Sequence, residues 1–99
     1  ILYLNTKNIL IEEDFHNFGT VNQVPIFPRE IVKRAIFLDA SSLIIAHNHP
    51  SGDVTPSKSD IDITNKIKLA LKYVNIELHD HIIISNKSHY SFRYNGLLD

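Results

Sequence analysis

The beginning of the chain alternates short apolar runs with polar segments. An apolar run at residues 1–4 and a strand-like segment at residues 9–15 flank the turn-prone segment Asn5-Thr6-Lys7-Asn8. Two such runs separated by a turn predict a β-hairpin. We expect Phe18-Gly19-Thr20 to close this region and residues 21–27 to form an irregular loop.

The next apolar positions change from a strand-like to a helical spacing. Pro28 suits the first turn of a helix, where its missing N–H removes no hydrogen bond. Residues Ile31, Ala35 and Leu38 then recur at helical spacing, which predicts a helix over residues 29–40. The mainly apolar run at residues 42–46 is too short for a helix and predicts a central strand buried on both faces.

The second half of the chain predicts the longest helix and two further strands. After a loop rich in proline and glycine, Ser57 begins a helix that Asn75 ends. Its expected buried face consists of Ile63, Ile67, Ala70, Leu71 and Val74. Strands follow at residues 81–84 and 89–93, so the order β-β-α-β-α-β-β predicts an α/β fold with a mixed β-sheet flanked by helices.

Composition limits the classes of protein to consider. The 99 residues are 43% hydrophobic and 21% charged, which predicts a single globular domain over residues 1–99. No stretch is apolar enough to span a membrane and no signal peptide is recognisable, so a cytoplasmic protein is expected. The chain begins at Ile1 inside an apolar run, which suggests a domain truncated at its N-terminal edge.

The charge balance argues against a nucleic-acid-binding surface. The formal net charge is −1, whereas phosphate binding depends on clustered lysine and arginine. The few basic clusters fall at helical spacings typical of solvated helix faces. Tyr90, Phe92 and Tyr94 are expected to pack in the core and on the sheet rather than stack on bases.

Three residues form a candidate metal site. His47 and His49 lie two positions apart at the end of the predicted central strand, so both imidazoles can face the same side. Asp60 lies in the first turn of the helix that follows. The absence of cysteine excludes thiolate ligands. Two imidazoles and one carboxylate are a typical catalytic zinc set with an open position for water, so one zinc ion is the expected cofactor.

Each part of this pattern also has a simpler explanation. A His-x-His pair alone is usually two polar residues at a strand end, and Ser57-x-x-Asp60 alone is a helix-capping pair. The combination favours a site because it lies at the carboxyl end of a central strand, where open sheets bind ligands.

The same residues resemble a known family. His-x-His-Pro followed by Ser-x-x-Asp is similar to the JAMM motif of MPN-fold metalloproteases, and the segment Ala46-His47-Asn48-His49-Pro50-Ser51-Gly52-Asp53 resembles the bacterial RadC proteins. Further similar segments are Gly19-Thr20-Val21-Asn22-Gln23-Val24, Pro28-Arg29-Glu30, Asp80-His81 and Tyr90-Ser91-Phe92. The resemblance implies the MPN fold, which is similar to the cytidine-deaminase-like architecture. It also implies a zinc-dependent hydrolase of peptide or isopeptide bonds.

The resemblance also assigns roles around the metal. It implies that His47, His49 and Asp60 hold zinc and that Ser57 stabilises the oxyanion of the tetrahedral intermediate. The glutamate that serves the family as general base is expected upstream of Ile1. No glutamate of this chain matches that position: the four are Glu12, Glu13, Glu30 and Glu77.

Other residues near the C-terminus have alternative readings. Asp80 and His81 are expected to support the sheet or to orient a ligand imidazole from behind. His79 forms a second His-x-His with His81 but is interpreted as incidental, because RadC-like chains commonly have an apolar residue there.

Two other functions and several properties stay open. One alternative is a metal-binding interaction module without catalysis, and another is a DNA-repair-associated role, suggested by the history of the RadC name. The substrate, expected to be a peptide or protein, has no readable code in this sequence. The exposed edges of a mixed sheet leave homodimerisation open.

Overall fold

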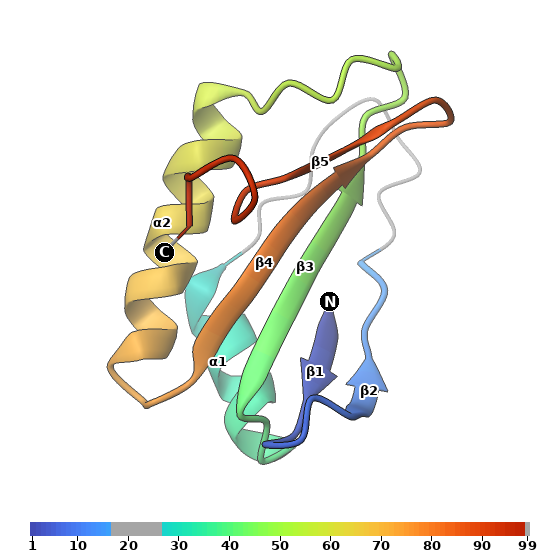
Figure 1. Ribbon diagram of the computed structural model, residues 1–99. Coiled ribbons are helices and arrows are strands. Elements are labelled where there is room, and N and C mark those ends of the chain that lie inside the picture. Colours follow the sequence, from blue (N-terminus) through green and yellow to red (C-terminus); the bar gives the residue numbers. More distant parts are fainter. Residues whose placement is uncertain (17–26, 99) are drawn as a thin grey trace.

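A five-stranded sheet and two helices make up the described part of the chain. The computed structural model describes residues 1–16 and 27–98 (Figure 1). In chain order its elements are β1 (Leu2–Leu4), β2 (Leu10–Glu13), α1 (Pro28–Phe37), β3 (Ser42–Asn48), α2 (Lys58–Lys72), β4 (Glu77–Ile84) and β5 (His89–Ser91). This order confirms the predicted α/β class with a mixed sheet.

The strands lie in the order β2-β1-β3-β4-β5. All neighbouring strands are antiparallel except β3 and β4, which are parallel. A parallel pair requires a crossover, and α2 provides it. The predicted hairpin is present as β1 and β2, although β2 is short and its residues are exposed at the sheet edge.

Both helices contribute to a core on one face of the sheet. Residues of α1 and α2 pack with those of β1, β3 and β4 in a single apolar cluster, whose largest fully buried members include Tyr3, Leu43, Ile67, Leu71 and Ile83. Figure 1 shows α1 behind the sheet and α2 alongside β4. The C-terminal segment adds Phe92 to the same core.

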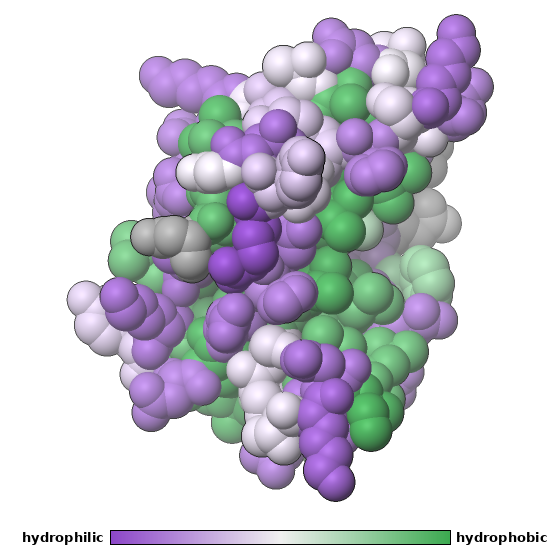
Figure 2. Space-filling model, in the orientation of Figure 1, coloured by the Kyte–Doolittle hydropathy of each residue, from purple (hydrophilic) through white to green (hydrophobic). Residues whose placement is uncertain are grey.

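The prediction that β3 is buried on both faces was wrong. Leu43 and Ile45 are buried, whereas Ile44 is half-buried and Ala46 is exposed. The reason is that the helical layer covers only one face, and alternate strand residues point away from it. In the same orientation, Figure 2 shows green apolar surface between polar side chains on the face opposite α1.

Element ends differ from the predicted ones by a few residues. Helix α1 ends at Phe37 rather than residue 40, and β4 begins at Glu77, four residues earlier than predicted. Val74 lies beyond α2 and is exposed, and Tyr94 is 89% exposed, so the expectation that they pack in the core was wrong. Asn75 has a positive φ of 59°, a conformation suited to the helix exit predicted there.

One extra residue interrupts the pairing of β3 with β4. Leu43 pairs with Leu78 but the next residue, Ile44, pairs with Asp80, so His79 is a β-bulge. Because strand side chains alternate, this insertion exchanges the faces of all later residues of β4 relative to β3. His81 consequently lies on the helix-covered face with Ile45, where Asp80 would otherwise lie.

Some expectations fall outside the described part of the chain. The segment Phe18-Gly19-Thr20, most of the loop at residues 21–27 and the RadC-like segment 19–24 are among these. Among the residues described, no helix combines the length and the apolar character that crossing a membrane requires.

The packing of the core predicts that alanine substitutions of two leucines of α2 change the free energy of unfolding by very different amounts. Leu71 is fully buried and Leu69 is 54% exposed. We expect Leu71→Ala to lower the free energy of unfolding by about 2–5 kcal/mol, because it leaves a cavity. Leu69→Ala, the same change on the exposed side, should stay within about 0.5 kcal/mol of the unsubstituted chain. Urea denaturation followed by circular dichroism measures both, and equal losses would contradict this packing.

Candidate metal centre

Strand β3 and the residue after it place two histidines side by side. His47 pairs with Ile83 near the end of β3, and the backbone N–H of His49 donates to the Ile84 carbonyl at 2.9 Å. This bond keeps the chain extended for one residue beyond Asn48, so both imidazoles lie on the same side. Gly52, with φ of 90°, then turns the chain away.

Helix α2 brings Asp60 to the same point through its capping box. The Ser57 hydroxyl accepts from the Asp60 N–H at 3.0 Å, and an Asp60 carboxylate oxygen accepts from the Ser57 N–H at 2.9 Å. The predicted capping pair is therefore present, even though aspartate is a shorter partner than glutamate. The cap fixes where α2 begins and holds the carboxylate at the end of the helix nearest to the histidines.

The three side chains converge. His47 Nε2 lies 2.9 Å from His49 Nε2 and 3.5 Å from Asp60 Oδ1. His49 Nε2 lies 3.3 Å from Asp60 Oδ2. Neighbouring ligand atoms of a tetrahedral zinc ion are about 3.3 Å apart, given bonds of about 2.0–2.1 Å. Among the residues described, His47, His49 and Asp60 form the only group of three or more such side chains that could hold a metal ion.

The contact of His49 with the Asp53 carbonyl fixes which of its ring nitrogens carries the hydrogen. His49 Nδ1 lies 2.9 Å from the Asp53 carbonyl, which can only accept, so Nδ1 carries the hydrogen and Nε2 a lone pair. His47 Nδ1 lies 2.8 Å from His81 Nε2. Two Nε2 atoms at 2.9 Å repel unless a cation, either a proton or a metal ion, lies between them.

Burial and the cap shift the pKa values of His47 and Asp60. Burial lowers the pKa of His47, and the adjacent His49 adds to this against the opposing effect of Asp60. For Asp60, burial raises the pKa, but the hydrogen bonds with Ser57 and the two histidines together lower it by more, so the net pKa is below its ordinary value. Neutral imidazoles and an ionised carboxylate are the protonation states that metal binding requires.

His81 lies directly behind His47. The residue is 3% exposed, and its ring stacks on that of Phe92, with centroids 4.6 Å apart and planes 11° from parallel. Burial lowers its pKa to about 4. Its Nδ1 lies 2.6 Å from the Thr64 hydroxyl, which also donates to the Asp60 carbonyl at 2.6 Å.

Thr64 is a residue that sequence reasoning missed. It is fully buried on α2 and lies four residues after Asp60, on the same helical face. The available signal was a polar residue among the apolar positions of that face, at a spacing of four from a candidate ligand.

The Asp80 side chain, unlike that of His81, makes its hydrogen bonds within the sheet and not with the metal group. Its carboxylate accepts from the backbone N–H groups of His81 and Arg93 and from the Ser91 hydroxyl. It therefore braces the bulge in β4 and the strand next to it, which agrees with support of the sheet and not with orientation of an imidazole. The Arg93 guanidinium donates to the His79 carbonyl on the same bulge.

His79 and the glutamates stand apart from the metal group. The His79 side chain is half exposed and lies 3.7 Å from Glu77 at the start of β4. None of the four glutamates, all within the described residues, belongs to the group of His47, His49 and Asp60.

Comparisons with known proteins agree with the geometry. The family model described as "RadC-like JAB domain" matches residues 1–97. This chain belongs to the RadC-like JAB domain family. It is 51% identical over 98 residues to a UPF0758 protein of Rhodobacter capsulatus and, over the same length, to one of Ruegeria pomeroyi. The alignments cover 99% of this chain but only 46% and 44% of those two proteins, so the RadC-like chain spans less than half of their length.

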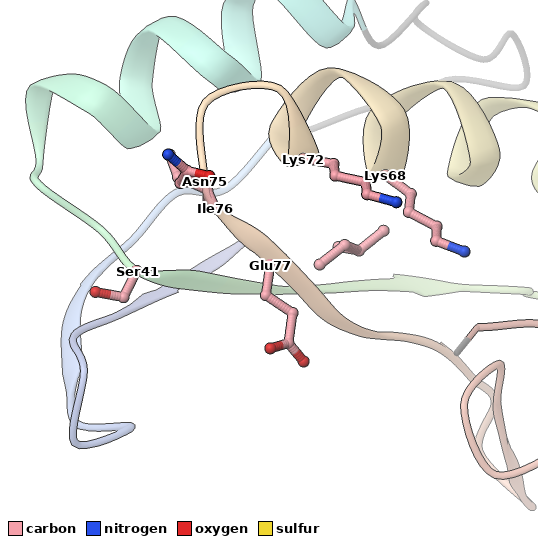
Figure 3. A pocket seen from close by; sticks show the side chains of 7 residues that line it. Ser41, Lys68, Lys72, Asn75, Ile76 and Glu77 are labelled. Atoms are coloured by element: carbon pink, nitrogen blue, oxygen red, sulfur yellow. The ribbon is translucent and has the colours of Figure 1, made fainter.

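A surface depression lies at the end of the sheet opposite to the metal group. It is open, and the side chains around it come from the start of β3, the end of α2 and the start of β4 (Figure 3). They include Lys68, Lys72 and Glu77. The metal group occupies the other ends of β3 and α2, so the two features are separate.

The buried His81 predicts a pH-dependent stability. Its pKa falls from 6.5 in the unfolded chain to about 4 in the folded one, so the unfolded chain binds more protons between these values. The stabilisation from the neutral ring should be complete above pH 6.5 and be lost as the pH falls toward 4, by roughly 3 kcal/mol.

The measurement is urea denaturation of chelator-treated protein from pH 7.5 to 4.5. His81→Gln is the control, since it removes the titrating ring and keeps the other groups. The difference between the two chains should grow smaller as the pH falls; a constant difference would contradict the depressed pKa of His81.

Proposed function

We propose that this domain is a zinc-dependent hydrolase that cleaves a peptide or isopeptide bond. The observation that carries the proposal is the convergence of His47, His49 and Asp60, with Nε2 and carboxylate oxygens 2.9–3.5 Å apart, in a chain of the RadC-like JAB family. JAMM domains typically use zinc for this chemistry, as the sequence resemblance implies.

The donor set suits zinc. Two neutral imidazole nitrogens and one carboxylate leave a fourth tetrahedral position, which water takes in hydrolytic sites. Zinc bound there supplies a water acidic enough to act as a nucleophile near neutral pH, and it polarises a carbonyl. The side chains of His47 and His49 are 31% and 21% exposed, so a substrate can approach from their side.

Ser57 fits the role of oxyanion donor in this proposal. Its hydroxyl oxygen accepts the Asp60 N–H, so its own proton can be donated to another acceptor. The N-terminus of α2, where it lies, adds partial positive charge. A hydroxyl in this position can stabilise the negative charge that develops on a carbonyl oxygen under attack.

The sheet register indicates where a general base would have to come from. Leu2 pairs with Ile44 in antiparallel register, so each residue upstream on β1 lies opposite one further along β3. A continuation of β1 would place the second residue before Ile1 opposite His47 and the fourth opposite His49. Both positions share the sheet face of His47, so we propose a glutamate at one of them.

A second candidate is metal binding without hydrolysis. It is favoured by the separation of all four glutamates of this chain from the metal group. The relatives are more than twice as long as this chain, so the substrate and partners of the whole protein, including any second copy of the chain or DNA, are to be tested with a protein of that length.

The metal content of the purified chain tests whether the site binds zinc. We expect about one zinc per chain by inductively coupled plasma mass spectrometry after purification and dialysis, and a loss of nearly all of it in His49→Ala. His79→Ala is the matched control, because this histidine lies outside the metal group, and it should retain zinc. A chain without zinc, or equal loss in both variants, would contradict the proposed site.

Hydrolysis is tested in a protein that carries this domain at the length of its relatives. Peptides and lysine-isopeptide conjugates serve as substrates, and Asp60→Ala should abolish cleavage. Ser57→Gly should lower kcat by about 10²–10³-fold with zinc retained, because it removes the hydroxyl donor.

The choice of glycine separates the two roles of Ser57. Glycine at an N-cap costs only a few tenths of a kcal/mol relative to serine, so the fold should survive. Ser57→Thr keeps both the cap and the hydroxyl and should remain active. Cleavage that persists in Asp60→Ala would exclude the zinc mechanism.

A further inference from the structure

Thr64 is joined to the metal group by an unbroken chain of hydrogen bonds. The chain runs from the Asp60 carbonyl to the Thr64 hydroxyl, then through both nitrogens of His81 to Nδ1 of His47. Its three contacts are 2.6, 2.6 and 2.8 Å long. Thr64 and His81 are 1% and 3% exposed, so water has no access to replace these partners.

The hydroxyl proton of Thr64 decides which atom donates in each of these hydrogen bonds. A backbone carbonyl only accepts, so the single hydroxyl proton of Thr64 is given to Asp60. Thr64 can then only accept at its second contact, and the hydrogen of His81 must be on Nδ1. A threonine hydroxyl bonded to the carbonyl four residues earlier is common in helices. Here that ordinary bond decides the tautomer of a buried histidine.

The tautomer of His81 in turn determines which ring nitrogen of His47 carries the hydrogen. With its hydrogen on Nδ1, the neutral ring of His81 presents a lone pair at Nε2, and His47 must donate to it from Nδ1. The Nε2 atom of His47 is then the one without a hydrogen, and it faces His49 and Asp60. The stacked ring of Phe92 holds His81 in the plane that makes both contacts.

We propose that Thr64 is a positioning residue that, through His81, fixes the proton of His47 on Nδ1 and so keeps Nε2 ready to bind a metal ion. This inference rests on the proposed metal site. It assigns a role in metal affinity to a threonine that itself contacts no ion, and it makes α2 contribute to the site twice, through the Asp60 carboxylate and through Thr64.

Removal of the Thr64 hydroxyl should reverse the direction of the hydrogen bond between His81 and His47. In Thr64→Val the shape of the side chain is kept, but His81 Nδ1 faces a methyl group. The hydrogen then moves to Nε2 of His81, which donates to His47 and leaves the His47 hydrogen on the ligand nitrogen. A metal ion must displace this hydrogen, and loss of such a supporting partner typically weakens metal binding about tenfold to hundredfold.

The first measurement needs no variant. Long-range ¹H–¹⁵N spectra of the metal-free chain near pH 7.5 distinguish the two tautomers, and we expect the Nδ1–H form for His81. The Nε2–H form in the unsubstituted chain would overturn the proposal. This measurement decides the proton chain even if Thr64→Val does not fold.

The second measurement is zinc affinity by competition with a chromophoric chelator. Thr64→Val should bind about tenfold to hundredfold more weakly than the unsubstituted chain, and Thr64→Ser, which restores the hydroxyl, should bind within about threefold of it. Equal affinity in Thr64→Val would overturn the role of Thr64. A loss in Thr64→Ser as large as that in Thr64→Val would show a packing effect and would overturn it as well.

The failures of the two proposals are distinguishable. Zinc binding by the unsubstituted chain with equal affinity in Thr64→Val would refute the role of Thr64 and leave the proposed function standing. An unsubstituted chain that binds no zinc would refute the proposed function and the role of Thr64 in metal affinity. The tautomer of His81 in the same sample would still report on the proton chain itself.

Discussion

The bulge at His79 decides which side chains of β4 face the helices. Without this extra residue, Asp80 would lie on the face of Ile45 and His47, and His81 would lie on the uncovered face. Three hydrogen bonds brace the bulge: the Arg93 guanidinium donates to the His79 carbonyl, and the Asp80 carboxylate accepts from the backbone N–H groups of His81 and Arg93. The contact between His81 and His47, and with it the chain of hydrogen bonds to Thr64, depends on this local insertion.

Asp60 connects the start of α2 to the metal group in three ways. Its carboxylate accepts from Ser57, its other carboxylate oxygen lies beside His47, and its carbonyl accepts from Thr64. The first contact fixes the register of the helix, and the third lies one turn further along the same face. A helix that began one residue earlier or later would rotate Asp60 and Thr64 away together, so the cap and the site constrain one another.

The sequence predicts the elements and the metal group but not the groups behind it. Period-two and period-3.6 patterns mark the order of strands and helices, and the His-x-His and Ser-x-x-Asp spacings mark His47, His49 and Asp60. The bulge has no such signal, because the strand-forming residues around His79 look continuous whether or not one of them is inserted. Without the bulge, the face of His81 cannot be assigned, and Thr64 has no visible partner.

Exposure differs between the two sides of the metal group, and this difference bears on its chemistry. The sealed side is formed by Thr64, His81 and Phe92, each at most 3% exposed, whereas the side chains of His47 and His49 remain partly open to solvent. An ion held by His47, His49 and Asp60 would therefore be shielded by protein on one side and accessible to solvent on the other. A structural zinc site is closed by four protein ligands, whereas three side chains converge here, which agrees with the hydrolytic role that we propose above.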